Sequence, residues 1–397
     1  MNSNILMDVN PYWKQFDPVR KEWFMVIAFI CIIIDILGIL ANSLVLFYLI
    51  KKKSRKISNG CFFIINLAIS DLLNLLINIP IKAMSNLNQA WFLNKTICQM
   101  YGFLGGLFGF VSITTMALMS IERFLIVKNP LNALKLNEKI MLSCSLFSWI
   151  YSTFWISLGF LTSRGFDLEG ILTSCTIDYL SRDLVTRITL IFLFIGGFII
   201  PFVIIVFCYC LILSILKLKN GILQYNFSSN NLMKHDVRMS SLFLPNDNLR
   251  YMSNASLNEN SKFIVNKLDK YSYQTECREI FEVNKKICKT YPKINLMKKN
   301  NYFLKREIQV SKTILMSVGF FCMSWFPYAI VLLVAQFGSN RESFITPLSA
   351  SLPALFAKFS TVANPIVYTL HHKECRLYFL EILKIRKATI CSFFVKK

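Results

Sequence analysis

A single lysine, Lys358, lies inside the apolar run of residues 352–368, which reads LPALFAKFSTVANPIVY. An amine placed in hydrocarbon is costly unless it is paired with an acid or used chemically. Lys358 precedes Pro365 by seven residues, about two helical turns, so snorkelling to the membrane surface is disfavoured and we expect a buried amine. Two roles remain open from the residues alone: a structural ion pair, or covalent chemistry of a nucleophilic amine.

The composition is that of a membrane protein. Hydrophobic residues make up 54% of the 397 residues, and aromatic residues 14%. The net charge of +22 could indicate nucleic-acid binding. However, the lysines and arginines cluster between apolar segments rather than among aromatics on one helix face, which indicates membrane topology and excludes nucleic acid as a partner. Most of the 12 cysteines lie inside apolar segments.

Seven apolar segments of the chain are long enough to cross a bilayer. They cover residues 23–50, 60–83, 97–127, 140–162, 185–217, 307–338 and 345–370. The first inter-segment loop reads KKKSRK, and the third and fifth loops and the tail are also basic. By the positive-inside rule the N-terminus is outside the cell. The sequence therefore predicts an all-α membrane protein, a seven-helix transmembrane bundle.

The remaining segments complete the predicted organisation. Residues 1–22 form an extracellular N-terminus, 23–217 the first five spans and 305–371 the last two. Residues 218–304 are rich in Asn, Ser and Lys and are predicted to be a disordered cytosolic loop. Residues 372–397 are a cytosolic tail, in which basic and apolar residues alternate over 372–386. That pattern predicts an amphipathic helix lying on membrane lipid.

Polar residues inside the spans should face the interior of the bundle. Asn42, Asp71 and Asn364 are such residues, and they could join helices or form a hydrated relay. At the inner end of the third span, Arg123 could pair with Glu122 locally and with Glu307 across helices. A pair that bridges two mobile helices is a latch, and an ordinary interfacial charge cluster is the alternative. Cys98 and Cys175, which lie in predicted outer loops, could form a disulfide or remain free thiols.

Several motifs, in this order and spacing, resemble the rhodopsin-like G-protein-coupled receptors. They are Asn42, the NLAISD of span two, Cys98, the ERF of span three, Trp149, Pro201 with Tyr209, the CMSWFP of span six and the NPIVY of span seven. Within that superfamily the chain resembles the opsins of the rhabdomeric and melanopsin-like branch. The segments YGFLGGLFGF, EGILTSCTIDYLSRD and SWFPYAIVLLVAQFG carry this likeness.

The resemblance implies covalently bound 11-cis retinal as the cofactor. Lys358 stands where opsins form a Schiff base with retinal, and Glu169 stands where rhabdomeric opsins have its counterion. Tyr101 occupies the position at which vertebrate visual opsins have a carboxylate. The small residues of span three would leave room for a polyene, and aromatic residues would form its walls; these positions are Gly105, Gly106, Gly109, Phe198, Trp325 and Tyr328.

The resemblance also implies a function: a light-sensing receptor, not an enzyme, in the plasma membrane of a photoreceptor cell. Photoisomerisation of retinal would favour the active bundle and expose a crevice for a heterotrimeric G protein, with the Gq class suggested by branch membership. Arrestin is the implied shut-off partner, through serines of the long loop. The coupling residues carried over are Glu122, Arg123, Tyr209, Glu307, Asn364, Pro365 and Tyr368.

Two other functions remain open. The first is a receptor for a diffusible peptide or lipid; an amine ligand is disfavoured because Gly105 stands where amine receptors carry an aspartate. The second is a retinal photoisomerase that does not signal. The chain also departs from the family pattern, which leaves the class of G protein open; the departures are Ala41, Phe124, Leu168 and His372.

Overall fold

A computed structural model describes residues 9–53, 61–128, 137–218 and 308–371. The chain divides into two compact units, Met1–Ile212 with Gln309–Lys397, and Leu213–Ile308. Of the second unit, only 213–218 and Ile308 belong to the described residues. The predicted long loop, apart from Leu218, and the predicted amphipathic helix at 372–386 lie outside the described residues.

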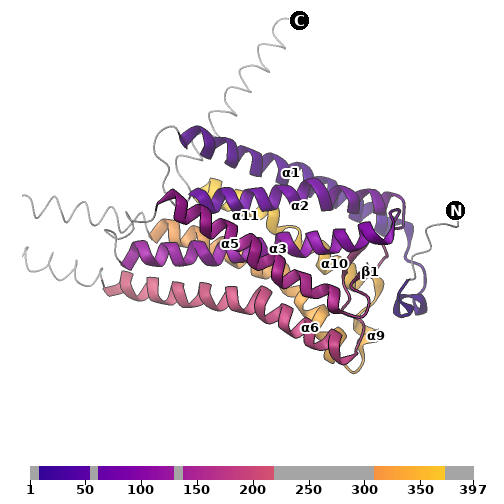
Figure 1. The fold of residues 1–397 in the computed structure, drawn as a ribbon. Coiled ribbons are helices and arrows are strands. Elements are labelled where there is room, and N and C mark those ends of the chain that lie inside the picture. Colours follow the sequence, from indigo (N-terminus) through magenta and orange to yellow (C-terminus); the bar gives the residue numbers. More distant parts are fainter. Residues whose placement is uncertain (1–8, 54–60, 129–136, 219–307, 372–397) are drawn as a thin grey trace, which may run out of the picture. The chain divides into compact units, whose positions relative to one another are not determined.

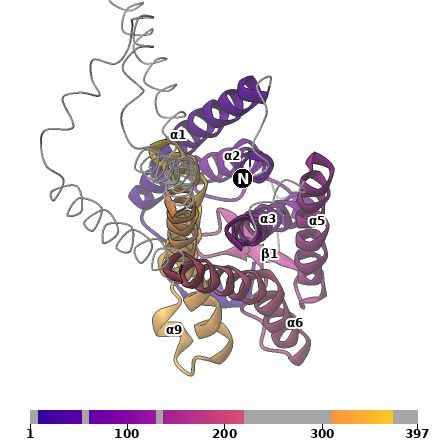
Figure 2. The ribbon, with the colours of Figure 1, turned by 90° about the vertical axis from the view of Figure 1, so that its left-hand side faces the viewer.

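Six helices of the described part are long and apolar enough to cross a membrane. Their bounds are α1 Lys21–Lys53, α2 Cys61–Leu87, α3 Lys95–Lys128, Glu138–Leu161 (α5 Glu138–Ser157 and a 3₁₀ turn), Leu184–Leu218 (beginning as α6 Leu184–Phe194) and Ile308–Phe337. In the larger unit, α1, α2, α3 and α5 run alongside one another (Figure 1). α3 lies between α2 and α5 and contacts both (Figure 2). These helices confirm the first six predicted spans.

The seventh span is divided into two helices, α10 (Pro347–Ala357) and α11 (Ser360–His371), at Lys358. The backbone tightens at the junction: the N–H of Lys358 donates to the carbonyl of Leu355 at 3.0 Å, three residues back rather than four. Further along, Pro365 has no N–H, which deprives the carbonyl of Thr361 of its helical partner. Asn42 Nδ2 donates to that carbonyl at 3.0 Å. The predicted interior position of Asn42 is confirmed, and its role is to join α1 to the interrupted span.

A short hairpin covers one end of the bundle, which we call the outer end. Strands β1 (Phe166–Glu169) and β2 (Ser174–Ile177) pair in antiparallel register. A disulfide between Cys98 and Cys175, with Cα atoms 5.4 Å apart, joins β2 to the start of α3. The predicted disulfide is therefore present, and the two strands are an addition to the predicted all-α fold.

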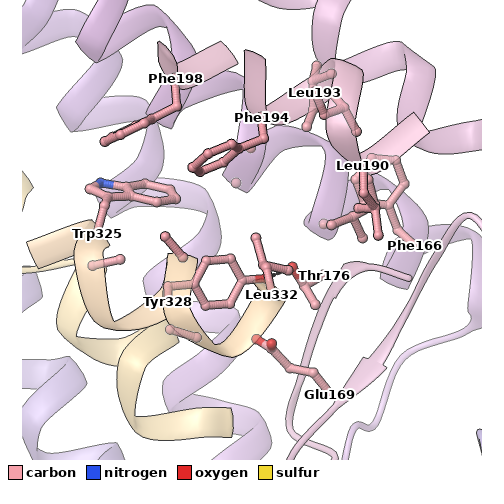
Figure 3. A pocket seen from close by; sticks show the side chains of 18 of the residues that line it. Phe166, Glu169, Thr176, Leu190, Leu193, Phe194, Phe198, Trp325, Tyr328 and Leu332 are labelled. Carbon is pink, nitrogen blue, oxygen red and sulfur yellow. Dashed lines mark hydrogen bonds between the residues drawn. The ribbon is translucent and has the colours of Figure 1, made fainter. Parts of the chain in front are cut away.

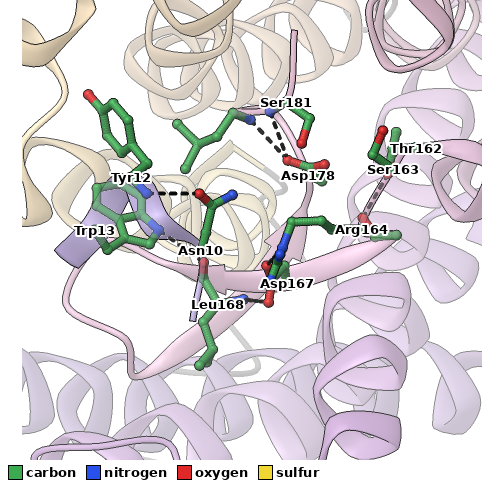
Figure 4. A network of polar contacts seen from close by, with 12 residues as sticks. Asn10, Tyr12, Trp13, Thr162, Ser163, Arg164, Asp167, Leu168, Asp178 and Ser181 are labelled. Atoms are coloured by element: carbon green, nitrogen blue, oxygen red, sulfur yellow. Dashed lines mark hydrogen bonds and ion pairs between the residues drawn. The ribbon is translucent and has the colours of Figure 1, made fainter. Parts of the chain in front are cut away.

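The N-terminal segment packs on this hairpin through the 3₁₀ helix η1 (Pro11–Gln15). Trp13 Nε1 donates to the carbonyl of Leu168 at 3.2 Å, as Figure 4 shows together with the neighbouring loop contacts. The Tyr12 hydroxyl donates to the carbonyl of Ile345 at 2.9 Å, next to the short helix α9 (Arg341–Phe344). Segments far apart in the sequence thus close the outer end together.

The polarity of the bundle is that of a protein in hydrocarbon. Large apolar side chains such as Phe29, Ile150 and Met323 are exposed on its helices. Asp71 and Asn364, by contrast, are buried. Since water is absent from the bilayer core, this is the arrangement with the smallest cost.

Candidate functional site

An apolar cavity opens among the helices beneath the hairpin, with a volume of about 250 Å³. Phe198, Trp325 and Tyr328, the aromatic walls expected from the sequence, all line it (Figure 3). The Tyr328 hydroxyl forms a hydrogen bond with Thr176 Oγ1 of β2. The cavity is just below the size range of small-molecule pockets, which begins near ~300 Å³. Its lining suits an apolar ligand with few polar groups.

Lys358 lines the same cavity from the junction between α10 and α11. Its Nζ donates to Asn74 Oδ1 at 3.2 Å, and Asn78 Nδ2 donates to the same oxygen at 3.0 Å. The sequence predicts a buried amine that does not snorkel to the membrane surface, and the structure places Lys358 part-buried in the cavity wall. A residue that lines a cavity keeps part of its surface free of protein contacts. The amine is thus available to a molecule inside.

Glu169 lies at the end of β1 and is 3% exposed. Burial raises the pKa of its carboxyl to about 7, against the lowering effect of Lys82, of the Ser174 hydroxyl and of Lys358, in that order. Ser174 Oγ donates to Oε1 at 3.4 Å, and Oε2 has no partner among the described residues. Within this part of the chain, no lysine nitrogen lies within the 4.0 Å of an ion pair from Glu169. A cation in the cavity would stabilise the charged carboxylate.

The glycines of α3 have distinct roles. A Cβ at Gly105 would lie 3.6 Å from Lys358 Nζ, so Gly105 faces the amine end of the cavity. A Cβ at Gly106 would lie 2.3 Å from Ile156 Cδ1, and one at Gly109 would lie 2.7 Å from Trp325 Cζ2. Gly109 therefore permits the close approach of Trp325 to α3, rather than lining the cavity itself. Tyr101, one turn before Gly105, is buried and lines the cavity.

A second polar cluster joins helices away from the cavity. Asn364 Nδ2 donates to Asp71 Oδ2 at 3.0 Å, and Ser112 Oγ donates to Asp71 Oδ1 at 3.4 Å. These bonds link α2, α3 and α11. They support the reading of these residues as links between helices.

The predicted coupling residues are partly brought together. Arg123 forms a buried ion pair with Glu122, with 2.8 Å between Nη2 and Oε1. Glu307, the predicted partner across helices, lies outside the described residues. The Tyr209 hydroxyl donates to the carbonyl of Ser311 at 3.0 Å, which links two helices. Tyr368, three residues after Pro365, is buried and directs its hydroxyl toward Met119 Sδ at 3.8 Å.

A polar stripe on α2 was not predicted from the sequence. Asn74, Asn78, Lys82 and Asn86 recur every four residues and are each at most 6% exposed. Residues four apart lie on one face of a helix, so the spacing alone could have revealed this stripe. Lys82, a second ionisable residue inside a span, satisfied the same criterion that singled out Lys358.

A bundle of membrane-spanning helices with an apolar cavity, closed at its outer end by a disulfide-linked hairpin, defines a seven-transmembrane receptor. The family model described as "7 transmembrane receptor (rhodopsin family)" matches residues 41–368. The chain is 32% identical over 376 residues to the rhodopsin of Enteroctopus dofleini, covering 94% of this chain and 68% of that protein. The chain therefore belongs to the rhodopsin family of receptors, and within it to the opsins.

Other relatives agree with this placement. A Gq-coupled rhodopsin of Mizuhopecten yessoensis is 31% identical over 373 residues, 93% of this chain and 62% of that protein. The crystal structure of squid rhodopsin matches with a TM-score of 0.69 at 29% identity, covering 95% of this chain and 89% of that one. The predicted opsin likeness and the seven-helix fold are confirmed.

Proposed function

We propose that this chain is a light-sensing receptor that holds 11-cis retinal covalently through a Schiff base on Lys358, with Glu169 as the counterion. The observation that carries this proposal is that the part-buried amine of Lys358 and the buried carboxyl of Glu169, whose Oε2 has no partner among the described residues, line one apolar cavity. The lining fits an apolar polyene, and Lys358 is the part-buried amine that an aldehyde could reach. When bound, retinal supplies light absorption and a change of shape on isomerisation.

The chain's own residues would hold the chromophore and balance its charge. Asn74 Oδ1 accepts a hydrogen bond from Lys358 Nζ and would keep this nitrogen oriented. Glu169, whose Oε2 has no hydrogen-bond partner within the described part of the chain, would offset a positive charge there. Trp325 packs against Gly109 of α3, so a shape change at this wall would bear on helix Ile308–Phe337. A ligand shifts such an equilibrium only through different affinities for its two states.

The signalling partner we propose is a heterotrimeric G protein of the Gq class. The name of the Mizuhopecten relative supports this class, and the buried Glu122–Arg123 pair supports a signalling receptor rather than an isomerase or another enzyme. Arrestin and membrane lipid complete the proposed partners. The proposed location is the plasma membrane of a photoreceptor cell, with residues 218–304 in the cytosol.

The direct test is chemical. The protein is expressed, incubated with 11-cis retinal in the dark, reduced with borohydride and digested. Mass spectrometry should find a retinyl adduct on the peptide containing Lys358, and Lys358→Ala should abolish it. Pigment-loaded cells should also release calcium on illumination, dependent on phospholipase C. An unmodified Lys358 in folded protein would refute the chromophore assignment, and a light response through cyclic nucleotides alone would refute the Gq assignment.

A further inference from the structure

The cavity holds a second lysine that the proposed function does not use. Lys82, on α2, lines the cavity and is 2% exposed, less than Lys358. Its Nζ makes no hydrogen bond or ion pair with any residue that the structure describes. A buried ammonium without a partner is costly. Lys82 precedes the end of α2 at Leu87 by five residues, and its burial shows that its amine does not reach the outer surface.

Lys82 belongs to the same side of the cavity as Lys358. Asn78, one turn before Lys82 on the polar stripe of α2, donates to the oxygen of Asn74 that also accepts from Lys358 Nζ. A Cβ at Gly105 would lie 3.6 Å from both Lys358 Nζ and Asn78 Nδ2. One turn of helix is about 5.4 Å long. Lys358 Nζ therefore contacts the polar stripe of α2 at Asn74, two helical turns before Lys82.

The charges around these amines do not balance. Five further ionisable residues surround Glu169 and the two lysines. They are Cys31 and Asp35 of α1, Tyr101 of α3, Tyr179 of the outer loop and Tyr328 of helix Ile308–Phe337. Tyrosine and cysteine are ordinarily neutral at pH 7. Asp35, the one other acid among them, interacts electrostatically with Cys31 but not with Glu169.

Arg187 also lines the cavity, where its guanidinium lies against the Phe337 ring and adds no negative charge. Among the residues that the structure describes, two amines of the cavity therefore share one carboxylate. Lys82 has the stronger effect on that carboxylate, because it lowers the pKa of Glu169 more than Lys358 does.

We propose that Lys82 is a second cation of the chromophore cavity, which competes with the nitrogen on Lys358 for the charge of Glu169 and so makes that nitrogen release its proton more readily. This inference rests on the proposed attachment of retinal to Lys358. A conjugated imine is a weaker base than a primary amine, so the linkage nitrogen is the one that releases its proton when the two nitrogens share one carboxylate. Loss of the proton from the linkage nitrogen shortens the wavelength of absorption. Lys82 is thus a positioning residue: it acts through Glu169 on the charge of the linkage nitrogen and so helps to set the wavelength that the pigment absorbs.

Two measurements on the full-length protein test this inference. The first is a pH titration of the absorption band of the dark pigment, for wild type, Lys82→Met and Lys82→Arg. Met retains the length of the side chain without its charge, whereas Arg retains the charge. We expect the midpoint between the long- and short-wavelength forms to rise by at least about one pH unit in Lys82→Met, a tenfold change in proton affinity. Lys82→Arg should remain near wild type.

The second measurement needs no retinal. In ligand-free protein, the infrared carbonyl band of protonated Glu169, assigned by its loss in Glu169→Gln, should titrate at higher pH in Lys82→Met than in wild type. Lys82→Gln provides a second neutral variant if Lys82→Met does not fold. Equal midpoints in wild type and the neutral variants, in both measurements, would overturn the inference while leaving the attachment to Lys358 intact. Absence of a retinyl adduct on Lys358 would instead refute the proposed function and, with it, the role of Lys82 in colour.

Discussion

At the scale of single residues, the carboxyl of Glu169 makes the stability of the folded protein depend on pH. Its pKa is raised by burial to about 7 from 4.5, so between these values the folded chain binds more protons than the unfolded chain. Stability is therefore fully present below about pH 4.5 and is lost as pH rises toward 7. For a buried group one pKa unit corresponds to about 1.4 kcal/mol, which gives a loss of up to about 3 kcal/mol.

We predict that Glu169→Gln removes this dependence in ligand-free protein. The measurement is thermal denaturation in detergent micelles at pH 5 and pH 8, for wild type and variant. Wild type should lose more stability than the variant between the two values, because Gln has no proton to release. An equal loss in both proteins would show that Glu169 is charged in the folded state over the whole range.

The residues of the cavity differ in how well they could be predicted from the sequence. Lys358 is recognisable because it stands alone in an apolar run, and Glu169 because it matches a family motif. Lys82 is missed because the segment around it already contains several polar residues, so no single residue stands out. The role of Gly109 could not be predicted either, since its contact with Trp325 joins residues more than 200 positions apart.

At the scale of elements, the π-helix Ile195–Ile199 interrupts the regular pattern of helix Leu184–Leu218. The N–H of Ile200 donates to the carbonyl of Ile195, which leaves the carbonyl of Gly196 without its helical partner. The Tyr151 hydroxyl donates to this carbonyl at 2.7 Å. A Cβ at Gly196 would lie 2.2 Å from Trp155 Cδ2, so the close approach of α5 requires glycine at this position.

Gly196→Ala should therefore destabilise the protein by roughly 1–3 kcal/mol through overpacking. Gly319→Ala is the matched control: it lies within a long helix, and a Cβ there would meet nothing within 4 Å. This substitution should be neutral or stabilise by about 0.5–1 kcal/mol, because alanine loses less backbone entropy on folding. The melting temperature should fall in Gly196→Ala and should stay unchanged or rise in Gly319→Ala. Equal shifts would contradict the packing argument.

The outer hairpin gives a second prediction for an element. The disulfide between Cys98 and Cys175 joins residues separated by 77 positions, and removing such a cross-link costs roughly 2–5 kcal/mol. Cys175→Ser should lower the melting temperature and reduce retention of a ligand, since β2 lines the cavity. Cys144→Ser is the control, because Cys144 is a free cysteine of α5. A similar effect of both variants would show that loss of a thiol, rather than of the cross-link, matters.

The helices that could be predicted from the sequence are those whose length and hydrophobicity suit a membrane span. Length and composition predict the six long helices, because a helix that crosses the bilayer needs about 20 mainly apolar residues. The break at Lys358 and the hairpin at 166–177 have no such signal. The first depends on hydrogen bonds from other helices, such as that of Asn42 with Thr361, and the second on a disulfide and on contacts with the N-terminal segment.

At the scale of the whole receptor unit, the interrupted span is held by polar contacts to α1 and α2. Asn42 bonds to Thr361, Asn74 to Lys358 and Asp71 to Asn364. All three contacts lie inside a bundle whose exterior is apolar. Since the cavity is bounded by this span and by helix Ile308–Phe337, its contents affect the packing of both.

Retinal and light should both change the stability of the receptor. A group bound only to the folded protein stabilises it, and the cation that we propose on Lys358 would also stabilise the carboxylate of Glu169, which has no ion pair among the described residues. We expect the melting temperature to be highest for the dark pigment, lower after illumination and lowest without retinal. The illuminated form should be less stable because an isomerised chromophore would no longer match the cavity in which it was bound. Lys358→Ala, incubated with retinal in the same way, should melt at one temperature in light and dark. A light effect of equal size in that variant would mean that the chromophore acts without the covalent bond.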